Sequence, residues 1–201
     1  MSSLVLVRHG RTAANAQGLL LGRLDVALDE LGERQARAVA DAVLATTGPI
    51  TAVVSSPLTR TRQTAAAFGL TVTVDDRFVE LDYGEYDGRP LSDVPAEVWG
   101  AWRSDPGFSP PGGETLRQVA ERVAEACEDW AGRAGGGAVV IVTHVSPLKA
   151  AVAWALGVGD ETGWRTRVDP ASISRVAVDA PVPVLRSFNE TGHLAGIRPS
   201  G

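Results

Sequence analysis

The sequence predicts an α/β fold with a mostly parallel sheet, helices on both faces and an antiparallel strand near the C-terminus. Short apolar runs alternate with helical patterns, and the runs are nearly continuous in Val, Ile and Leu. Strands that alternate with helices form parallel sheets covered on both faces. Only residues 179–183 separate the last two runs, so these must turn back on each other as an antiparallel pair.

The apolar runs that we interpret as strands are all short enough to be single strands of a buried sheet. In chain order they are residues 4–7, 50–54, 70–74, 138–143, 173–178 and 184–188. Helical patterns lie between them, with apolar residues about one turn apart and Gly or Pro near the ends. These patterns cover residues 28–44, 57–68, 113–132 and 147–156.

Residues 84–113 interrupt this alternation. The segment holds six glycines, five prolines and two of the five tryptophans, and it is predicted as an ordered excursion over the top of the sheet. Its Trp99, Trp102 and Phe108 fit either a lid wall or the packing core of the excursion. We find no internal repeat and no linker, so residues 1–201 are predicted to form one domain.

The composition excludes several classes of protein. Hydrophobic residues make up 44% and charged ones 21%, as in soluble globular proteins. A net charge of −5 argues against a general nucleic-acid binder, which normally has a basic face. No apolar run approaches the roughly 20 residues that cross a membrane. No signal-peptide pattern opens the chain. We therefore expect a cytoplasmic protein without nucleic-acid or membrane partners.

Cysteine and histidine usage points to a protein without disulfides or metal. Cys127 is the only cysteine, so no disulfide framework is expected. With three histidines the chain also shows no cluster at metal-ligand spacing. Neither a metal nor an organic cofactor is predicted.

Charged residues follow the predicted strands. The first strand ends in Arg8 and His9, Arg60 follows the second, Glu80 the third and His144 the fourth. Because the carboxyl ends of parallel strands meet at one edge, we expect these side chains to lie close together. Arginines offer paired donors to phosphate oxygens, and helix N-termini add backbone N–H groups. A carboxylate among such cations indicates proton transfer at a phosphate site.

The segments that carry chemistry also form an ordered set of motifs. They are residues 8–12 with Asn15, residues 55–60 with 63–65, Glu80 with Gly84 and Gly88, His144 with residues 145–147, and residues 188–194. Together they resemble the signature of the histidine phosphatase superfamily, the phosphoglycerate-mutase-like proteins. The chain length and residues 143–147 are most similar to its small phosphatase branch, which includes α-ribazole phosphatase and broad acid phosphatase domains.

The resemblance implies roles for the residues at the strand ends. His9 would be the nucleophile and form a phosphohistidine, which requires a neutral imidazole. Arg8, Arg60 and His144 would bind the phosphoryl oxygens. Glu80 would be the general acid for the leaving oxygen and then the base for water.

Further positions are predicted to bind phosphate or to shape the site. Asn15 is an amide donor to phosphate or the cap of a short turn, and the backbone N–H of Val145 is a donor. Val145 stands where the family usually has glycine, and Arg11 where it mostly has Glu or Gln. Gly10 removes a Cβ where the backbone is expected to approach a ligand.

Other polar residues near these motifs are assigned to structure or solvent. Glu85 and Asp87 are interpreted as solvated loop carboxylates, and Arg62 as a solvated helix residue. Lys149, about one helical turn past Ser146, is interpreted as a solvated lysine, with contact to the substrate as the alternative. His193 is assigned to the packing of the C-terminal segment.

The function predicted from these residues is hydrolysis of a small phosphate monoester. A phosphoglycerate mutase would use the same pocket but return the phosphoryl group to a sugar acid. An inactive domain that binds a phosphorylated ligand is the alternative from another class. The sequence leaves the substrate open, and the oligomeric state as well, a homodimer included.

Overall fold

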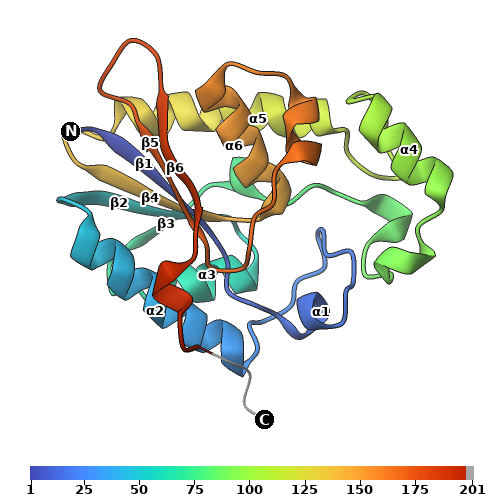
Figure 1. Cartoon of the computed structure of the whole chain (residues 1–201), viewed down its shortest axis with the longest axis horizontal. Coiled ribbons are helices and arrows are strands. Elements are labelled where there is room, and N and C mark those ends of the chain that lie inside the picture. Colours follow the sequence, from blue (N-terminus) through green and yellow to red (C-terminus); the bar gives the residue numbers. More distant parts are fainter. Residues whose placement is uncertain (198–201) are drawn as a thin grey trace.

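In the computed structural model, which describes residues 1–197, six strands form one mixed sheet (Figure 1). Residues 198–201 of the predicted domain lie outside the described part. The strands are β1 (Ser3–Arg8), β2 (Ile50–Ser55), β3 (Val72–Val74), β4 (Ala138–Thr143), β5 (Ile173–Ala177) and β6 (Val184–Glu190). Their order in the sheet is β3-β2-β4-β1-β5-β6.

The strand directions confirm the predicted fold class. β1 pairs in parallel with β4, and β2 in parallel with both β3 and β4. β5 is antiparallel to β6, as predicted, and also to β1. β3 is shorter than the predicted run because it is an edge strand, with Leu70 and Val74 exposed.

The helices confirm the four predicted patterns and add two that the sequence analysis missed. They are α1 (Ala13–Ala16), α2 (Glu30–Thr46), α3 (Thr59–Ala66), α4 (Ala96–Ser104), α5 (Leu116–Gly132) and α6 (Val145–Leu156). The start of α2 is capped by the Asp29 side chain, and that of α5 by a reciprocal capping box between Thr115 and Gln118. α6 begins two residues before the predicted start, because Pro147 is tolerated in a first turn.

The core forms on both faces of the sheet. Along β1, Leu4 and Leu6 pack with α5 and α6, whereas Val5 and Val7 pack with α2 and α3. Figure 1 shows these two pairs of helices on opposite sides of the strands. Successive side chains of a strand point to opposite faces, so this one apolar run supports both layers. Burying each such side chain contributes about 1.5–3 kcal/mol.

The excursion at residues 84–113 has a small core of its own. Trp102, 1% exposed, packs with Leu20 and Val94 and against the rings of Tyr83 and Phe108. Helix α4 begins directly after Pro95, and the Gly/Pro-rich composition concealed it from the sequence analysis. Figure 1 shows α4 at the far end of the molecule from the strand β6.

Short 3-10 turns complete the described chain, at Asp76–Phe78, Gly84–Tyr86, Leu91–Asp93, Asp160–Arg165 and Gly192–Leu194. Among the helices of residues 1–197, none combines the length and apolar character needed to cross a membrane.

Candidate active site

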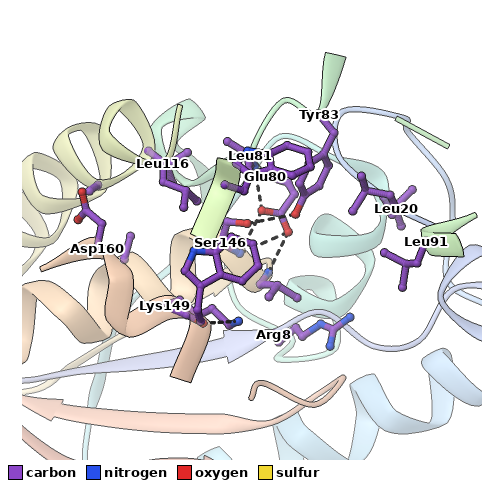
Figure 2. Close-up of a pocket in the computed structure, with 18 of the residues that line it drawn as sticks. Arg8, Leu20, Glu80, Leu81, Tyr83, Leu91, Leu116, Ser146, Lys149 and Asp160 are labelled. Carbon is purple, nitrogen blue, oxygen red and sulfur yellow. Dashed lines mark hydrogen bonds between the residues drawn. The ribbon is translucent and has the colours of Figure 1, made fainter. Parts of the chain in front are cut away.

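A cavity of about 310 Å³ opens where the strand ends meet the excursion. Of the residues predicted for the site, Arg8, His9, Asn15, Glu80 and Val145 line it. Figure 2 shows Glu80 in the middle of the cavity wall, with Arg8 below it in that view. The other two predicted residues, Arg60 and His144, are fully buried and do not belong to the wall.

His9 is held at the end of β1 with its ring orientation fixed. Its backbone N–H donates to Thr143 O at 3.0 Å, and its Nδ1 lies 2.7 Å from Gly10 O. A carbonyl oxygen only accepts, so Nδ1 carries the proton and Nε2 is the nitrogen left for a ligand. Burial and the nearby charges of Arg60 and Arg8 hold the pKa of His9 well below its usual value. The imidazole is therefore neutral at physiological pH, as a nucleophile requires.

The glycine after His9 allows a close approach that the sequence analysis did not predict. A Cβ at Gly10 would lie 2.4 Å from the carbonyl oxygen of Gly32 in the first turn of α2. The missing side chain thus lets the end of β1 pack against α2, and the close approach is to this helix.

Arg8 presents unused donors close to His9. Its Nη1 donates to Val168 O at 2.6 Å, while Nε is buried and has no partner among the described residues. Burial lowers the pKa of Arg8 to about 10, with Glu80 and Asp169 opposing the shift. The guanidinium stays charged at neutral pH, and a buried N–H without a partner costs about 1–3 kcal/mol, which an anionic ligand would relieve.

Arg60 and His144 lie behind His9 and bind each other. The His144 and His9 ring centroids are 5.2 Å apart. Arg60 Nε donates to His144 Nδ1 at 3.2 Å, so the proton of the neutral ring sits on Nε2, 2.7 Å from Ser56 Oγ. Burial, Arg60 and His9 hold the pKa of His144 well below its usual value.

The remaining donors of Arg60 go mainly to backbone carbonyls. Its Nη1 donates to Leu24 O and its Nη2 to Gly22 O, each at 2.8 Å. The structure therefore places Arg60 and His144 beside His9, with their hydrogen bonds directed to the protein. Their predicted contacts with phosphoryl oxygens stay a prediction.

Glu80 occupies the N-terminal end of α6. Its Oε2 accepts from Val145 N–H at 3.0 Å, and its Oε1 accepts from Ser146 N–H at 3.1 Å and from Leu81 N–H at 2.8 Å. Figure 2 shows these bonds converging on the carboxylate. The positive end of the helix favours a negative charge here. The Val145 N–H predicted to hold phosphate is thus directed at Glu80, and its role toward phosphate stays a prediction.

Asn15 has the structural function that was one of its two predicted roles, the capping of a short turn. Its Oδ1 accepts from Thr12 N–H at 3.2 Å, which closes a capping box at the start of α1. This bond fixes the amide so that its NH2 end is available for a ligand, and the residue lines the cavity. The donor role toward phosphate itself is untested.

Several polar residues near the motifs lie outside the cavity wall. Arg62 and Glu85 are exposed, as predicted. Asp87, predicted to be solvated, instead accepts from the backbone N–H groups of Gly22 and Leu24. The carboxylate therefore fixes the loop that also supplies carbonyl acceptors to Arg60.

Two more of the positions noted in the sequence have structural partners. His193 Nε2 lies 2.9 Å from Ala171 O, consistent with the predicted packing role. Arg11, the departure from the family pattern, pairs with Asp29 at 2.8 Å and is absent from the wall. The extra cation of this sequence is thus neutralised away from the cavity.

Lys149 corrects one prediction. The residue is half-buried in the cavity wall, and its Nζ donates to Gly163 O at 2.7 Å, so it is not a solvated surface lysine. Burial lowers the pKa of this ammonium group. Figure 2 shows Lys149 on the same side of the cavity as Ser146.

Tyr83 was missed by the sequence analysis. Its Oη lies 3.3 Å from Ser146 Oγ, and it lines the cavity. Burial raises the pKa of the phenol, so it stays protonated. Its place three residues after Glu80 is the one signal that could have drawn attention to it.

Within residues 1–197, no three His, Cys, Asp or Glu side chains are grouped so that they could hold a metal ion.

Comparison with known proteins identifies the family. The model of the histidine phosphatase superfamily (branch 1) matches residues 4–191, nearly the whole chain. The chain therefore belongs to the histidine phosphatase superfamily.

Relatives in this family carry different names. A Mycobacterium tuberculosis protein described as bifunctional is 37% identical over 199 residues. Phosphoserine phosphatase 1 of Hydrogenobacter thermophilus is 33% identical, and the match covers 96% of this chain and 95% of that protein. A probable phosphoglycerate mutase of Yersinia pestis is also 33% identical, with 96% and 95% covered. The match covers 95% of this chain but only 54% of the mycobacterial relative, so the chain spans about half of that protein.

A solved structure supports the fold. A phosphoserine phosphatase mutant from Entamoeba histolytica, in complex with phosphoserine, superposes with a TM-score of 0.88 at 24% identity, covering 96% of this chain and all of that one. At this identity the likeness concerns the fold alone.

Proposed function

We propose that this chain is a metal-independent phosphomonoesterase that transfers the phosphoryl group of a small phosphorylated metabolite to His9 and then to water. The observation that carries the proposal is the state of His9. Its ring is neutral and buried, its proton is fixed on Nδ1 by Gly10 O, and its Nε2 remains for a ligand beside the guanidinium of Arg8. Such a group is an activated nucleophile for a phosphate ester.

In the first transfer, the Nε2 lone pair of His9 forms the N–P bond as the P–O bond to the leaving group breaks. The electron pair of that bond goes to the leaving oxygen, which takes a proton from the Glu80 carboxyl group. Once Glu80 has given up this proton, its carboxylate is stabilised by the backbone N–H groups of Val145 and Ser146 at the start of α6.

In the second transfer, water attacks phosphorus, and Glu80 accepts the proton that water loses. The P–N bond breaks, its electron pair returns to His9 Nε2, and inorganic phosphate leaves. Arg8, with a buried Nε that has no partner in residues 1–197, would neutralise charge on the equatorial oxygens in both steps.

Arg60 and His144 would assist the same steps from behind His9. The charge of Arg60 helps to keep His9 neutral, and the ring of His144 packs edge-on against that of His9 with centroids 5.2 Å apart. Direct contact of His144 with a phosphoryl oxygen would require its Nε2–H to exchange Ser56 Oγ for the ligand.

Two other functions, that of a mutase and that of a binding domain, are less well supported by the site. A mutase must shield the phosphohistidine from water while its sugar acid reorients. The excursion supplies a single helix of nine residues, α4, as cover. A binding domain would need Arg8 but would have no use for both a neutral histidine and a carboxyl group beside it.

Turnover measurements with excess EDTA separate these readings. With 4-nitrophenyl phosphate we expect hydrolysis at a rate within about twofold of that without chelator, a change well under 1 kcal/mol in barrier. With 3-phosphoglycerate and catalytic 2,3-bisphosphoglycerate, released phosphate should exceed 2-phosphoglycerate. An excess of isomerised product would show that the protein is a mutase. Ligand binding without turnover of any ester would show that it is a binding domain.

A further inference from the structure

The cavity is much larger than a phosphoryl group needs. Its volume of about 310 Å³ falls within the roughly 300–1,000 Å³ of pockets that hold whole small molecules. Arg8, His9 and Glu80 form one part of the wall, which we call the phosphate end. In Figure 2, Leu116 and Asp160 lie on one side of Glu80, and Leu20 and Leu91 on the other. The space beyond the phosphate end is where the alcohol part of an ester would lie.

That part of the wall is built from apolar side chains of four separate elements. We call it the leaving-group chamber. Its residues are Trp99 of α4, Leu116, Val119 and Ala120 of α5, Ala153 of α6, and Trp164 of the turn Asp160–Arg165. Concave apolar walls of this kind bind apolar parts of ligands and leave orientation to a few polar groups.

The aromatic side of the chamber is held together by contacts between its own rings. Trp99 packs against Trp102 with ring centroids 5.4 Å apart, and against Trp164 at 6.2 Å in an edge-on arrangement. Trp102 is fixed in turn by Tyr83 and Phe108, each at 5.7 Å. A preformed wall saves the ordering cost that a ligand would otherwise meet.

The charges in the chamber do not select an anionic leaving group. Apart from the three groups at the phosphate end, the charged residues of the wall are Lys149 and Asp160. They have opposite signs, and the Lys149 ammonium is bonded to Gly163 O. A carboxylate on the leaving group would lose hydration against the tryptophans without a net charge to compensate for it.

From these observations we propose that the chamber binds the leaving group and that the substrate is the phosphate monoester of an apolar alcohol, alkyl or aryl. The esters of a sugar acid or a hydroxy amino acid would be poor substrates. This inference rests on the proposed function, because it names the substrate class of the same site.

A series of unbranched alkyl phosphates tests the inference, since the leaving alcohols differ in apolar area and hardly in acidity. Along ethyl, butyl and hexyl phosphate, kcat/KM should rise roughly three- to fourfold per added methylene, the ratio for burying one CH2. Phosphoserine and 3-phosphoglycerate should fall below butyl phosphate. A flat series, or a maximum for either acidic substrate, would overturn the inference.

A filled chamber gives a second test. Ala120 is half-buried on α5 and lines the cavity, so Ala120→Leu occupies part of the chamber. It should lower kcat/KM for hexyl phosphate by at least about tenfold and change that for ethyl phosphate by less than about twofold. The control Ala124→Leu is on the same helix but off the wall, and should leave the hexyl-to-ethyl ratio unchanged. An unchanged ratio in Ala120→Leu would contradict the inference.

Binding without turnover separates this inference from the proposed function. Calorimetry with His9→Ala and the non-hydrolysable ethyl-, butyl- and hexylphosphonates should give a Kd that falls with chain length, with a matching change in tryptophan fluorescence. If the Kd falls with chain length but the native chain hydrolyses no ester, the proposed phosphatase function is wrong and apolar binding in the chamber is supported. If esters are hydrolysed while the Kd is independent of chain length, apolar binding in the chamber is wrong and the phosphatase function is supported.

Discussion

The two parts of the cavity are built on different principles. At the phosphate end, buried polar groups are tied to the protein by hydrogen bonds: His9 to Gly10 O, and Glu80 to three backbone N–H groups. In the leaving-group chamber the walls are tryptophan, leucine, valine and alanine, held by packing and, at Trp164, by the guanidinium of Arg103 over its ring. The first arrangement fixes atoms for one reaction, whereas the second fixes only a shape. We expect substitutions at the phosphate end to change the reaction, and those in the chamber to change the choice of substrate.

The largest expected effect is that of removing the nucleophile. In His9→Ala the covalent route is lost, and kcat for 4-nitrophenyl phosphate should fall by about 10³-fold or more. Circular dichroism and thermal unfolding show whether the fold survives. A folded His9→Ala protein with more than a tenth of native turnover would place the chemistry elsewhere.

Glu80→Gln should have a smaller effect that depends on the leaving group. A poor leaving group such as an alkoxide needs the proton, so hexyl phosphate should lose about 10²- to 10³-fold in kcat/KM. An activated aryl phosphate needs little protonation and should lose far less. Equal losses for both esters would show that Glu80 acts only by holding the start of α6.

The buried histidines should make stability depend on pH. The folded-state pKa values of His9 and His144 are depressed, so below about pH 6.5 the unfolded chain binds protons that the native chain does not. Their contribution is fully present above pH 6.5 and is lost as the pH falls toward the folded-state values. Denaturant unfolding should show a slope of up to about 2.7 kcal/mol per pH unit, for two protons.

The matched variant for this measurement is His9→Asn, in which the slope of the unfolding free energy against pH should fall by about the contribution of one proton. A free energy of unfolding that does not change between pH 7 and pH 5 would contradict the neutral state assigned to both rings.

Ser56→Ala is expected to have the smallest effect and addresses the role of His144. Removing the hydroxyl leaves the buried Nε2–H of His144 without its acceptor, at a cost of about 1–3 kcal/mol in the free energy of unfolding. If His144 binds phosphoryl oxygens, added orthovanadate should raise the Tm of the variant more than that of the native protein. An equal rise in the Tm of both proteins would show that His144 does not bind phosphoryl oxygens and only supports His9.

The sequence was sufficient for most of the fold because its signals are local. A six-residue apolar run such as β4 and the stripe of α5 are each visible in their own residues. Helix α4 was missed since Gly100 and the surrounding prolines contradict helix propensity, and the packing of Trp102 outweighs it. At β3 the run of β-branched residues suggested a longer strand than an edge position supports.

The candidate site divides in the same way. The positions of Arg8, His9 and Glu80 in the cavity follow from strand ends and motifs, which the sequence displays. The hydrogen-bond partners of Arg60 and His144 could not be predicted, because only the folded chain brings these donors and acceptors together. The chamber is likewise assembled from segments distant in sequence, and no single segment carries a pattern for it.

In the proposed mechanism, His9 becomes phosphorylated during turnover. Native protein mixed with ³²P-labelled 4-nitrophenyl phosphate and quenched within milliseconds should retain protein-bound label that is stable in base and labile in acid, the behaviour of a phosphoramidate. Mass spectrometry at high pH should place the phosphoryl group on the peptide containing His9, and His9→Ala should retain none. Label on a serine or an aspartate, or steady turnover without any bound label under this quench, would contradict a phosphohistidine intermediate at His9.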